Sequence, residues 1–529
     1  MYSLVLKNAV IADGTGGPRY FGDICIQEGK IADILTHYDG AAVRTLDVSG
    51  LVAAPGFIDI HSHSDTIPLQ TAMEPESKLF QGVTLEITGN CGISHLPVPR
   101  ERRDELTQFY NAFLPASVDY IQLEDASVCD YVCHVQKRPP ATHYGVLIGH
   151  GTLRGAVMGF GMRPPAPGEQ VQMEQLLDRQ LEEGAFGMSL GLIYPPSSFA
   201  QKDELVGLAK VLARRNGILA VHMRSESDQV FQAMDEMLEI ARISGVSLEL
   251  SHLKLMGRAQ WGRPEELLAM LDRARSEGIQ VTCDQYPYHA SSTGLSALAP
   301  GWAHDGGVAC LAQRAGQPTQ ELLDAIQAEM DRRGGPEAVL VVDTSGHLPQ
   351  CNGKTIDEIA AQWKVSPAQA VTRCLSLCEG TVSCIYFTMN MDDVCRIMQD
   401  MHICVGSDGV SYGYAKAAGR GFHPRNFGTF PRFLQTVRER NLMPLEKAVY
   451  KMTGLPASIL GLKDRGLIRP GMAADLTVFH PEQVADCSTY TNSAVPPKGI
   501  PYVIVSGQLA LDQGKQTPVR AGGILLHQG

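Results

Sequence analysis

The chain of 529 residues is longer than one ordinary domain. Its 44% hydrophobic residues are enough to form the core of one large domain and of a smaller second one. Its net charge of −12, without a long basic run, argues against a nucleic-acid partner. No stretch of about 18 apolar residues predicts a membrane span, no signal-type segment opens the chain, and the 13 cysteines form no compact disulfide framework. These features predict a cytoplasmic protein without a membrane or nucleic-acid partner.

Both ends of the chain show the pattern of β-structure. Short strand-like runs separated by turn signals fill residues 1–54, and similar runs recur at residues 475–479, 502–507 and 508–511. We expect residues 1–54 and 465–529 to pair into one small β-sandwich domain.

The large body between these ends, residues 55–464, alternates strand-like runs with helix-like segments. This rhythm is typical of a parallel sheet with helical crossovers. Eight strands are expected, at residues 57–61, 83–88, 144–150, 185–190, 217–222, 246–252, 279–284 and 402–408. Their number matches a closed (β/α)8 barrel, so the predicted fold class is α/β with a TIM barrel.

The interval between the seventh and eighth strands is too long for a single crossover. It holds a loop at residues 291–307, a helix-like segment near 318–333, and strand-like runs at 338–343 and 382–389. We therefore expect an inserted subdomain over the site, at about residues 290–345.

Several predicted strands end in side chains that suit a metal ion. The first ends in His61 and His63, which β alternation would place on one face. The second leads into Cys91, and the fifth and sixth end in His222 and His252. Each could alone be a buried packing residue, but the carboxyl ends of barrel strands form one face, so these matching positions favour a metal site.

Further motifs extend along most of the chain. They are Asp13-Gly-Thr-Gly, Pro55-Gly-Phe-Ile-Asp-Ile-His-Ser-His, Gly89-Asn-Cys-Gly, Gly187-Met-Ser-Leu-Gly-Leu-Ile-Tyr-Pro-Pro, Ser251-His-Leu-Lys, Tyr286-Pro-Tyr, Gly406-Ser-Asp-Gly and His423-Pro-Arg-Asn-Phe-Gly-Thr-Phe. With these motifs the chain resembles the amidohydrolase superfamily and, within it, the D-aminoacylase (N-acyl-D-amino-acid deacylase) family. The resemblance implies a metal-dependent (β/α)8 barrel with a small β-sandwich from both termini.

The metal ligands narrow the choice within the superfamily. Members that resemble the hydantoinases bridge two metals with a carboxylated lysine at the end of the fourth strand, and the fourth predicted strand here contains no lysine. Cys91 offers a soft thiolate instead, which suits zinc. By resemblance to D-aminoacylases, Cys91, His222 and His252 hold a tight zinc ion, while His61 and His63 belong to a second, weaker position.

Asp408 ends the eighth predicted strand, which neighbours the first strand in a closed barrel. An aspartate before glycine is usually a turn residue, but here it is expected beside His61 and His63. A metal lowers the pKa of bound water from about 15.7 toward 7, and a neighbouring carboxylate can take the proton. We expect Asp408 to act as general base and then general acid in amide hydrolysis.

The resemblance implies a small-molecule substrate, an N-acyl amino acid, whose α-carboxylate needs a cationic or hydrogen-bonding clamp. By resemblance, Arg425, Tyr286 and Ser292 bind this group, with Lys254 close by. Residues 276–313 contain neither Lys nor Arg, which favours substrates with a neutral or hydrophobic side chain. The preference for the D enantiomer follows from the resemblance alone.

Other functions stay open at this point. A cyclic-amide hydrolase fits the barrel, although it predicts the bridging lysine that is missing here. An acidic N-acyl-D-amino-acid deacylase is a second alternative. A non-catalytic scaffold on the same fold would show eroded ligands, whereas all the candidate ligands are present. No oligomeric state is predicted.

Overall fold

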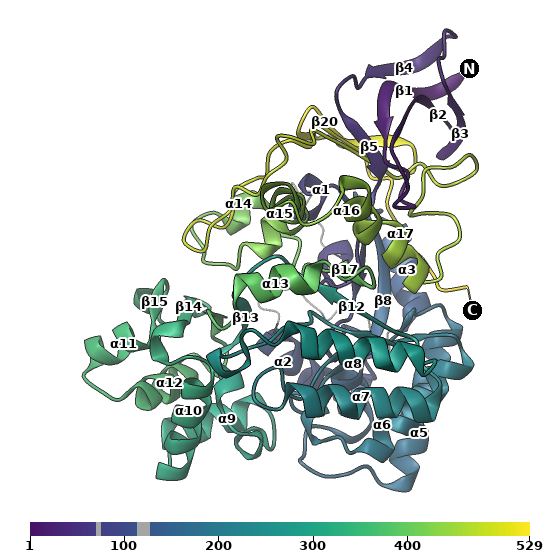
Figure 1. Ribbon diagram of the computed structural model, residues 1–529. Coiled ribbons are helices and arrows are strands. Elements are labelled where there is room, and N and C mark those ends of the chain that lie inside the picture. Colours follow the sequence, from purple (N-terminus) through teal and green to yellow (C-terminus); the bar gives the residue numbers. More distant parts are fainter. Residues whose placement is uncertain (70–75, 114–126, 529) are drawn as a thin grey trace.

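The computed structural model describes residues 1–69, 76–113 and 127–528, which form three sheets with surrounding helices (Figure 1). An eight-stranded parallel sheet lies at the centre, a nine-stranded sheet combines both ends of the chain, and a four-stranded sheet forms a separate lobe. None of the helices in these residues has the length and apolar character needed to cross a bilayer.

The central sheet is the predicted (β/α)8 barrel. Its strands, in spatial order, are β6 (Phe57–Asp59), β7 (Val83–Thr88), β8 (His143–Gly149), β9 (Gly187–Gly191), β10 (Ile218–His222), β11 (Ser247–Leu250), β12 (Val281–Gln285) and β17 (Ile403–Val405). The barrel closes beyond β6 and β17, where Asp408 N donates to His61 O at 2.8 Å and His63 N donates to Gly409 O at 2.9 Å. Each strand overlaps its predicted range, so this part of the fold is confirmed.

Amphipathic helices cover the outside of the barrel. In α6 (Lys202–Arg214), Leu205, Leu208, Ala209 and Leu212 are buried, a spacing that forms one apolar stripe. Helices α5 (Pro167–Glu182), α7 (Val230–Ser244) and α8 (Pro264–Ser276) pack in the same way into one hydrophobic layer with the strands. The barrel interior contains mainly aliphatic side chains from alternating strand positions, as expected for a filled barrel.

Further helices complete the body of the molecule. They are α1 (Ser77–Phe80), α2 (Arg103–Phe113), α3 (Val128–Gln136), α4 (His150–Met158), α13 (Met391–Met398), α14 (Tyr414–Ala417), α15 (Arg425–Arg440), α16 (Leu445–Met452) and α17 (Gly454–Ile459).

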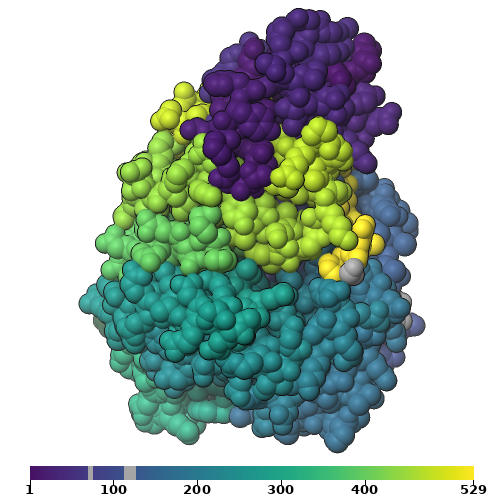
Figure 2. All heavy atoms as spheres, turned by 45° about the vertical axis from the view of Figure 1, so that its right-hand side comes forward, coloured from purple at the N-terminus to yellow at the C-terminus, as the bar shows by residue number. Residues whose placement is uncertain are grey.

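Both chain ends contribute to the nine-stranded sheet. It contains β1 (Tyr2–Ile11), β2 (Tyr20–Gln27), β3 (Lys30–Leu35), β4 (Ala42–Asp47), β5 (Val52–Pro55), β18 (Leu476–Phe479), β19 (Tyr502–Val505), β20 (Gln508–Asp512) and β21 (Lys515–Gln516). The two halves join where β18 pairs antiparallel with β5. The sheet curves around one core that includes Ile26 and Ile31 from the first half and Leu476 and Ile504 from the second. Figure 2 shows the N-terminal strands as a lobe at the top of the molecule.

The last residues leave this sheet and follow the barrel. Leu525 N donates to Tyr144 O at 2.7 Å, and His527 N donates to Gly184 O at 2.9 Å. These contacts lie at the amino-terminal ends of β8 and β9, on the opposite face from the predicted metal ligands. The end of the chain therefore packs on the barrel, although the sequence grouped it with the sandwich.

The insertion after β12 forms the third sheet. Its strands β13 (Ser291–Gly294), β14 (Val339–Asp343), β15 (Lys354–Thr355) and β16 (Ser383–Tyr386) are antiparallel and lie in the order β13-β16-β14-β15. Helices α9 (Val308–Gly316), α10 (Gln320–Arg332), α11 (Ile356–Trp363) and α12 (Pro367–Leu377) share a hydrophobic core with it. Because β16 pairs with both β13 and β14, the unit extends past residue 345, where the sequence placed its end. Figure 1 shows it as a lobe at the lower left.

Candidate metal and substrate site

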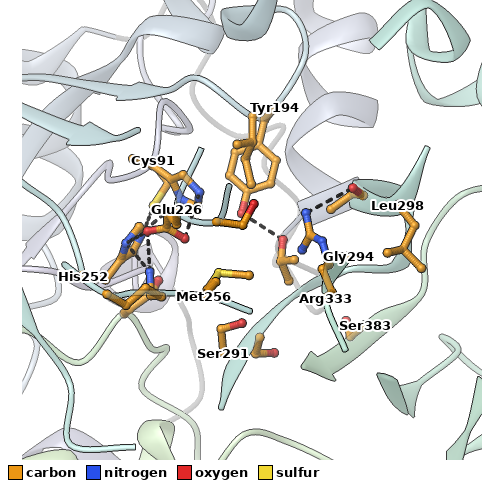
Figure 3. Close-up of a pocket in the computed structure, with 18 of the residues that line it drawn as sticks. Cys91, Tyr194, Glu226, His252, Met256, Ser291, Gly294, Leu298, Arg333 and Ser383 are labelled. Carbon is orange, nitrogen blue, oxygen red and sulfur yellow. Dashed lines mark hydrogen bonds and ion pairs between the residues drawn. The ribbon is translucent and has the colours of Figure 1, made fainter. Parts of the chain in front are cut away.

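The carboxyl ends of the barrel strands open into a cavity of about 680 Å³. Barrel residues line one side of it, and residues of the insertion line the other. All the predicted metal ligands except His61 line this cavity, and Figure 3 labels two of them, Cys91 and His252. His61 does not line it, but its Nε2 lies 3.4 Å from Cys91 Sγ.

The first potential metal position combines Cys91, His222 and His252, whose ligand atoms all lie within 4.8 Å of one another. His252 Nε2 is 2.8 Å from His222 Nδ1 and 3.5 Å from Cys91 Sγ. His222 ends β10, whereas Cys91 and His252 lie just beyond β7 and β11 in left-handed backbone, with φ of 53° and 38°. Left-handed backbone at two non-glycine residues is costly and typical of functional sites.

A second potential position combines His61, His63, Cys91 and Asp408. Asp408 Oδ1 is 3.0 Å from His63 Nε2, and Cys91 Sγ is 3.4 Å from His61 Nε2. His61 and Asp408 lie beyond the ends of β6 and β17, so these strands are shorter than predicted, and Asp408 also has a positive φ of 51°. Cys91 is shared by both groups.

The chemistry of this donor set fits a zinc ion. Although burial opposes ionisation of Cys91, the neighbouring His61 and His252 lower the pKa of its thiol well below the usual range. Burial lowers the pKa of His222, which favours the neutral imidazole that binds metals. Cysteine thiolate and histidine imidazole are both typical zinc ligands.

Two carboxylates that the sequence reading missed orient the histidines. Asp284 Oδ2 lies 3.0 Å from His61 Nδ1, and Glu226 Oε1 lies 2.9 Å from His252 Nδ1. In both rings the opposite nitrogen, Nε2, then faces Cys91. Such carboxylate partners set the tautomer and orientation of metal-binding histidines. Asp284 ends the seventh predicted strand, a position that could have identified it.

Asp59 is buried and joins the end of β6 to the residues that follow β17. Lys78 Nζ donates to Asp59 Oδ2 at 2.6 Å, and both side chains are fully buried. Asp59 Oδ1 also accepts a hydrogen bond from Ser407 N at 2.9 Å. Since Asp59 and Ser407 precede His61 and Asp408, this contact determines the spacing of the second group.

Arg425, the first residue of α15, contacts the site directly. Its Nη1 donates to Asp408 Oδ2 at 2.6 Å, and its Nη2 donates to Ser292 O at 3.1 Å. Burial alone would raise the pKa of Asp408, but the neighbouring Arg425 and His252 hold the pKa of this carboxyl well below its usual range. The Arg425 guanidinium also lies 5.2 Å from the ring centre of Tyr286.

The other predicted substrate-binding residues line the same cavity, and they differ in whether their polar groups already have hydrogen-bond partners. The Tyr286 hydroxyl is buried and has no hydrogen-bond partner in the described part of the chain. Lys254 Nζ contacts Glu226 Oε1 at 2.5 Å and lies 2.7 Å from His252 Nδ1. The Ser292 hydroxyl donates to Cys384 O at 2.9 Å, so Ser292 meets Arg425 through its carbonyl.

Two further cavity residues received no role from the sequence. Tyr194 follows β9, and its hydroxyl lies 2.8 Å from Thr293 Oγ1 of the insertion. Arg333 directly follows α10 and lines the cavity from the insertion. Arg333 lies in no recognisable motif, because its position depends on how the insertion packs over the barrel.

Comparisons with known proteins agree with this geometry. The amidohydrolase family matches residues 44–510. The N-acyl-D-glutamate deacylase of Alcaligenes xylosoxydans xylosoxydans is 37% identical over 525 residues, covering 99% of this chain and 96% of the relative. The D-aminoacylase of the same organism is 33% identical over 531 residues, covering 99% and 97%.

A solved structure is similar over the whole chain. It is the N-acyl-D-glutamate deacylase from Bordetella bronchiseptica, complexed with zinc and a phosphonate inhibitor that mimics the tetrahedral intermediate of the reaction. Its TM-score is 0.82 at 33% identity, with 100% of both chains covered. As the motifs predicted, the chain belongs to the amidohydrolase family and, within it, to the D-aminoacylases.

Proposed function

We propose that this protein is a zinc-dependent deacylase, which hydrolyses the amide bond of N-acyl-D-amino acids to a carboxylate and a free D-amino acid. One observation carries the proposal: two groups of metal ligands share Cys91 in a cavity that also contains Arg425 and Lys254. Two relatives, an N-acyl-D-glutamate deacylase and a D-aminoacylase, support the same substrate class.

The ligands divide into two positions. Cys91, His222 and His252 would hold the tight zinc ion, and His61 and His63 would contribute to the second, weaker position. When bound, zinc polarises the acyl carbonyl and lowers the pKa of water to near neutrality. Asp284 and Glu226 keep the histidine rings turned toward the metal positions.

Asp408 is the residue that moves the proton. Its carboxylate lies between His63 and Arg425 and can accept a proton from the attacking water at the carbonyl carbon. The C–O bond forms first, and the C–N bond then breaks as Asp408 returns the proton to the departing nitrogen. Asp408 therefore serves as base and then acid, and ends the cycle ionised.

Arg425, Tyr286 and Lys254 bind the α-carboxylate of the substrate. The planar guanidinium of Arg425 can bind a carboxylate through two parallel hydrogen bonds. The Tyr286 hydroxyl has a free hydrogen for the same group, since no described residue accepts it. Ser292 supports Arg425 through its backbone carbonyl rather than by direct contact of its hydroxyl.

Two alternatives are disfavoured by particular residues. A cyclic-amide hydrolase of the hydantoinase kind needs a lysine at the end of the fourth strand, and β9 (Gly187–Gly191) contains none. A scaffold without activity would not need to retain candidate ligands, whereas the described residues include two groups that could each hold a metal ion.

The test is an assay of the zinc-loaded protein on enantiomer pairs, N-acetyl-D- and N-acetyl-L-methionine and the corresponding glutamates. We expect release of the free amino acid from the D substrates only, and a large loss of that activity in Asp408→Asn. Hydrolysis of neither enantiomer, or of a cyclic amide only, would overturn the proposal.

A further inference from the structure

The cavity has a second cationic side chain on the side opposite the metal ligands. In Figure 3, Cys91, Glu226 and His252 lie at one side of the cavity, and Arg333 lies at the other. The whole Arg333 residue is 9% exposed, so it is a cavity residue and not a surface arginine. Arg425 serves the α-carboxylate near the metals, which leaves Arg333 without a role in the proposed reaction.

The protein holds the Arg333 guanidinium by one edge only. Its Nε donates to Glu329 Oε1 at 2.7 Å, and its Nη2 makes a long contact of 3.4 Å with Ala297 O. The guanidinium carbon lies 5.1 Å from the ring centre of Tyr386, which supports the plane of the group. Within the described ranges, Nη1 donates to no protein atom, so donors stay available to a ligand.

The charges around Arg333 are not balanced. Glu329 is shared, because Arg332 also donates to its carboxylate. Two guanidinium groups and one carboxylate leave a local charge of 2 − 1 = +1. A buried cation with uncommitted donors is stabilised by an anionic partner, and a carboxylate matches the flat geometry of a guanidinium.

The walls next to Arg333 are also polar. Thr293 and Tyr194 hydrogen-bond to each other across the cavity, and Ser291 and Ser383 line the same region. The expectation of a neutral side chain considered residues 276–313 alone, whereas this arginine comes from a later helix of the insertion.

We propose that Arg333 binds a second carboxylate of the substrate, so that the enzyme prefers N-acyl-D-amino acids with an acid group in addition to the α-carboxylate. This inference rests on the proposed function. The second carboxylate has two chemical sources, the side chain of the amino acid or a dicarboxylic acyl group. Both would bring the same anion to Arg333.

The first measurement compares acids with neutral amides of nearly equal shape. One pair is N-acetyl-D-glutamate and N-acetyl-D-glutamine, and the other is N-succinyl-D-methionine and its succinic monoamide. We expect kcat/KM of the wild-type protein to favour the acid at least about tenfold in one pair, since a charge-assisted hydrogen bond is lost in the amide. The pair that shows the preference identifies the source of the carboxylate.

Three variants separate recognition by Arg333 from a structural role. Arg333→Gln should lower kcat/KM for the preferred acid about 10- to 100-fold, mainly by raising KM, and leave its amide unchanged. Glu329→Gln should raise kcat/KM for the acid, because the Arg333 guanidinium loses its ion pair with Glu329 and becomes more available to the substrate. Arg373 is an exposed arginine on α12, so Arg373→Gln is the matched control. It should leave kcat/KM unchanged for both the acid and the amide. If Arg333→Gln fails to fold, the acid-to-amide ratio of kcat/KM in the wild type and in Glu329→Gln still tests the role of Arg333.

The outcomes distinguish this inference from the proposed function. Hydrolysis of all four D substrates with acid-to-amide ratios near one would overturn the role of Arg333 alone. Equal loss on acid and amide in Arg333→Gln would also contradict it. Absence of hydrolysis on every D substrate would overturn the proposed function.

Discussion

Arg425 and Asp408 form a hydrogen-bonded ion pair, in which Nη1 of Arg425 donates to Oδ2 of Asp408 at 2.6 Å. The group proposed to bind the α-carboxylate therefore contacts the group proposed to carry the proton, and both side chains are buried. In the proposed reaction, an incoming α-carboxylate would compete with Asp408 for the same guanidinium. Substrate binding and the proton transfer proposed for Asp408 would thus be coupled through Arg425.

Replacing Arg425 with methionine tests the binding half of this pair. We expect Arg425→Met to raise KM for N-acyl-D-amino acids about 10- to 100-fold, because a charge-assisted contact with the α-carboxylate is lost. Arg432→Met is a control on the same helix, since Arg432 donates to Pro287 O instead. An unchanged KM in steady-state assays of Arg425→Met would contradict the assignment.

Replacing Asp408 with asparagine tests the catalytic half. The amide keeps the size of the side chain and can still accept from Arg425, but it cannot take a proton. We expect kcat to fall about 10²- to 10⁴-fold, the usual contribution of a general base, with a smaller change in KM. Circular dichroism should show an unchanged fold, and a kcat within tenfold of the wild type would argue for another base.

Asp284 offers a test of metal positioning, because it touches His61 without being a ligand. We expect Asp284→Asn to weaken zinc binding by about 10- to 100-fold, since partners of this kind orient the ligand ring. Isothermal titration of the metal-free protein with zinc measures the affinity. Asp272→Asn, an exposed carboxylate on α8, should bind zinc as the wild type does, and equal affinities in the two variants would rule out the role of Asp284.

Asp475 links the terminal sheet to the barrel, so its ionisation contributes to stability. It is buried and contacts His143 at 3.4 Å, Arg465, and Ser506 N at 2.7 Å. Burial alone would raise its pKa, but His143 and Arg465 lower it from 3.8 to about 2. Because the folded pKa lies below the unfolded one, the stabilisation is complete above pH 4 and is lost as the pH falls through 2.

We therefore expect Asp475→Asn to lower the free energy of unfolding by about 2 to 3 kcal/mol at pH 7. The difference should shrink to roughly half at pH 3, as the carboxylate of the wild type becomes protonated in the unfolded state. Denaturant unfolding at the two pH values measures it, with exposed Asp464→Asn as the control. A difference that is independent of pH would show that the Asp475 carboxylate is not the cause.

The sequence was most informative about local patterns. The eight barrel strands are apolar runs bounded by turns, so they could be predicted. The candidate ligands His61, Cys91, His222 and His252 follow such runs, and this position predicted that they would lie close together. It was less informative where distant segments meet. The end of the insertion depends on the pairing of β16 with β14, and no local signal shows which strands pair.

The same limit applies to the site. Glu226 and Asp284 gain their roles from the orientation of histidine rings on neighbouring strands, which a linear pattern does not specify. Arg333 lies at the end of an ordinary amphipathic helix, and only the packing of the insertion over the barrel brings it to the cavity. Ser292 lines the cavity, but its hydroxyl donates to Cys384 O of the insertion, a contact that no local signal in the sequence shows.

The dependence of activity on zinc held by Cys91, His222 and His252 is the central claim, and a zinc titration tests it most directly. Protein stripped of metal with a chelator should be inactive on its best N-acyl-D-amino acid and should regain activity with about one equivalent of zinc. Cys91→Ala should not recover at that zinc concentration, whereas Cys129→Ala, at an exposed cysteine, should recover fully. Full activity of the metal-free protein, or recovery of Cys91→Ala equal to that of the wild type, would contradict the account.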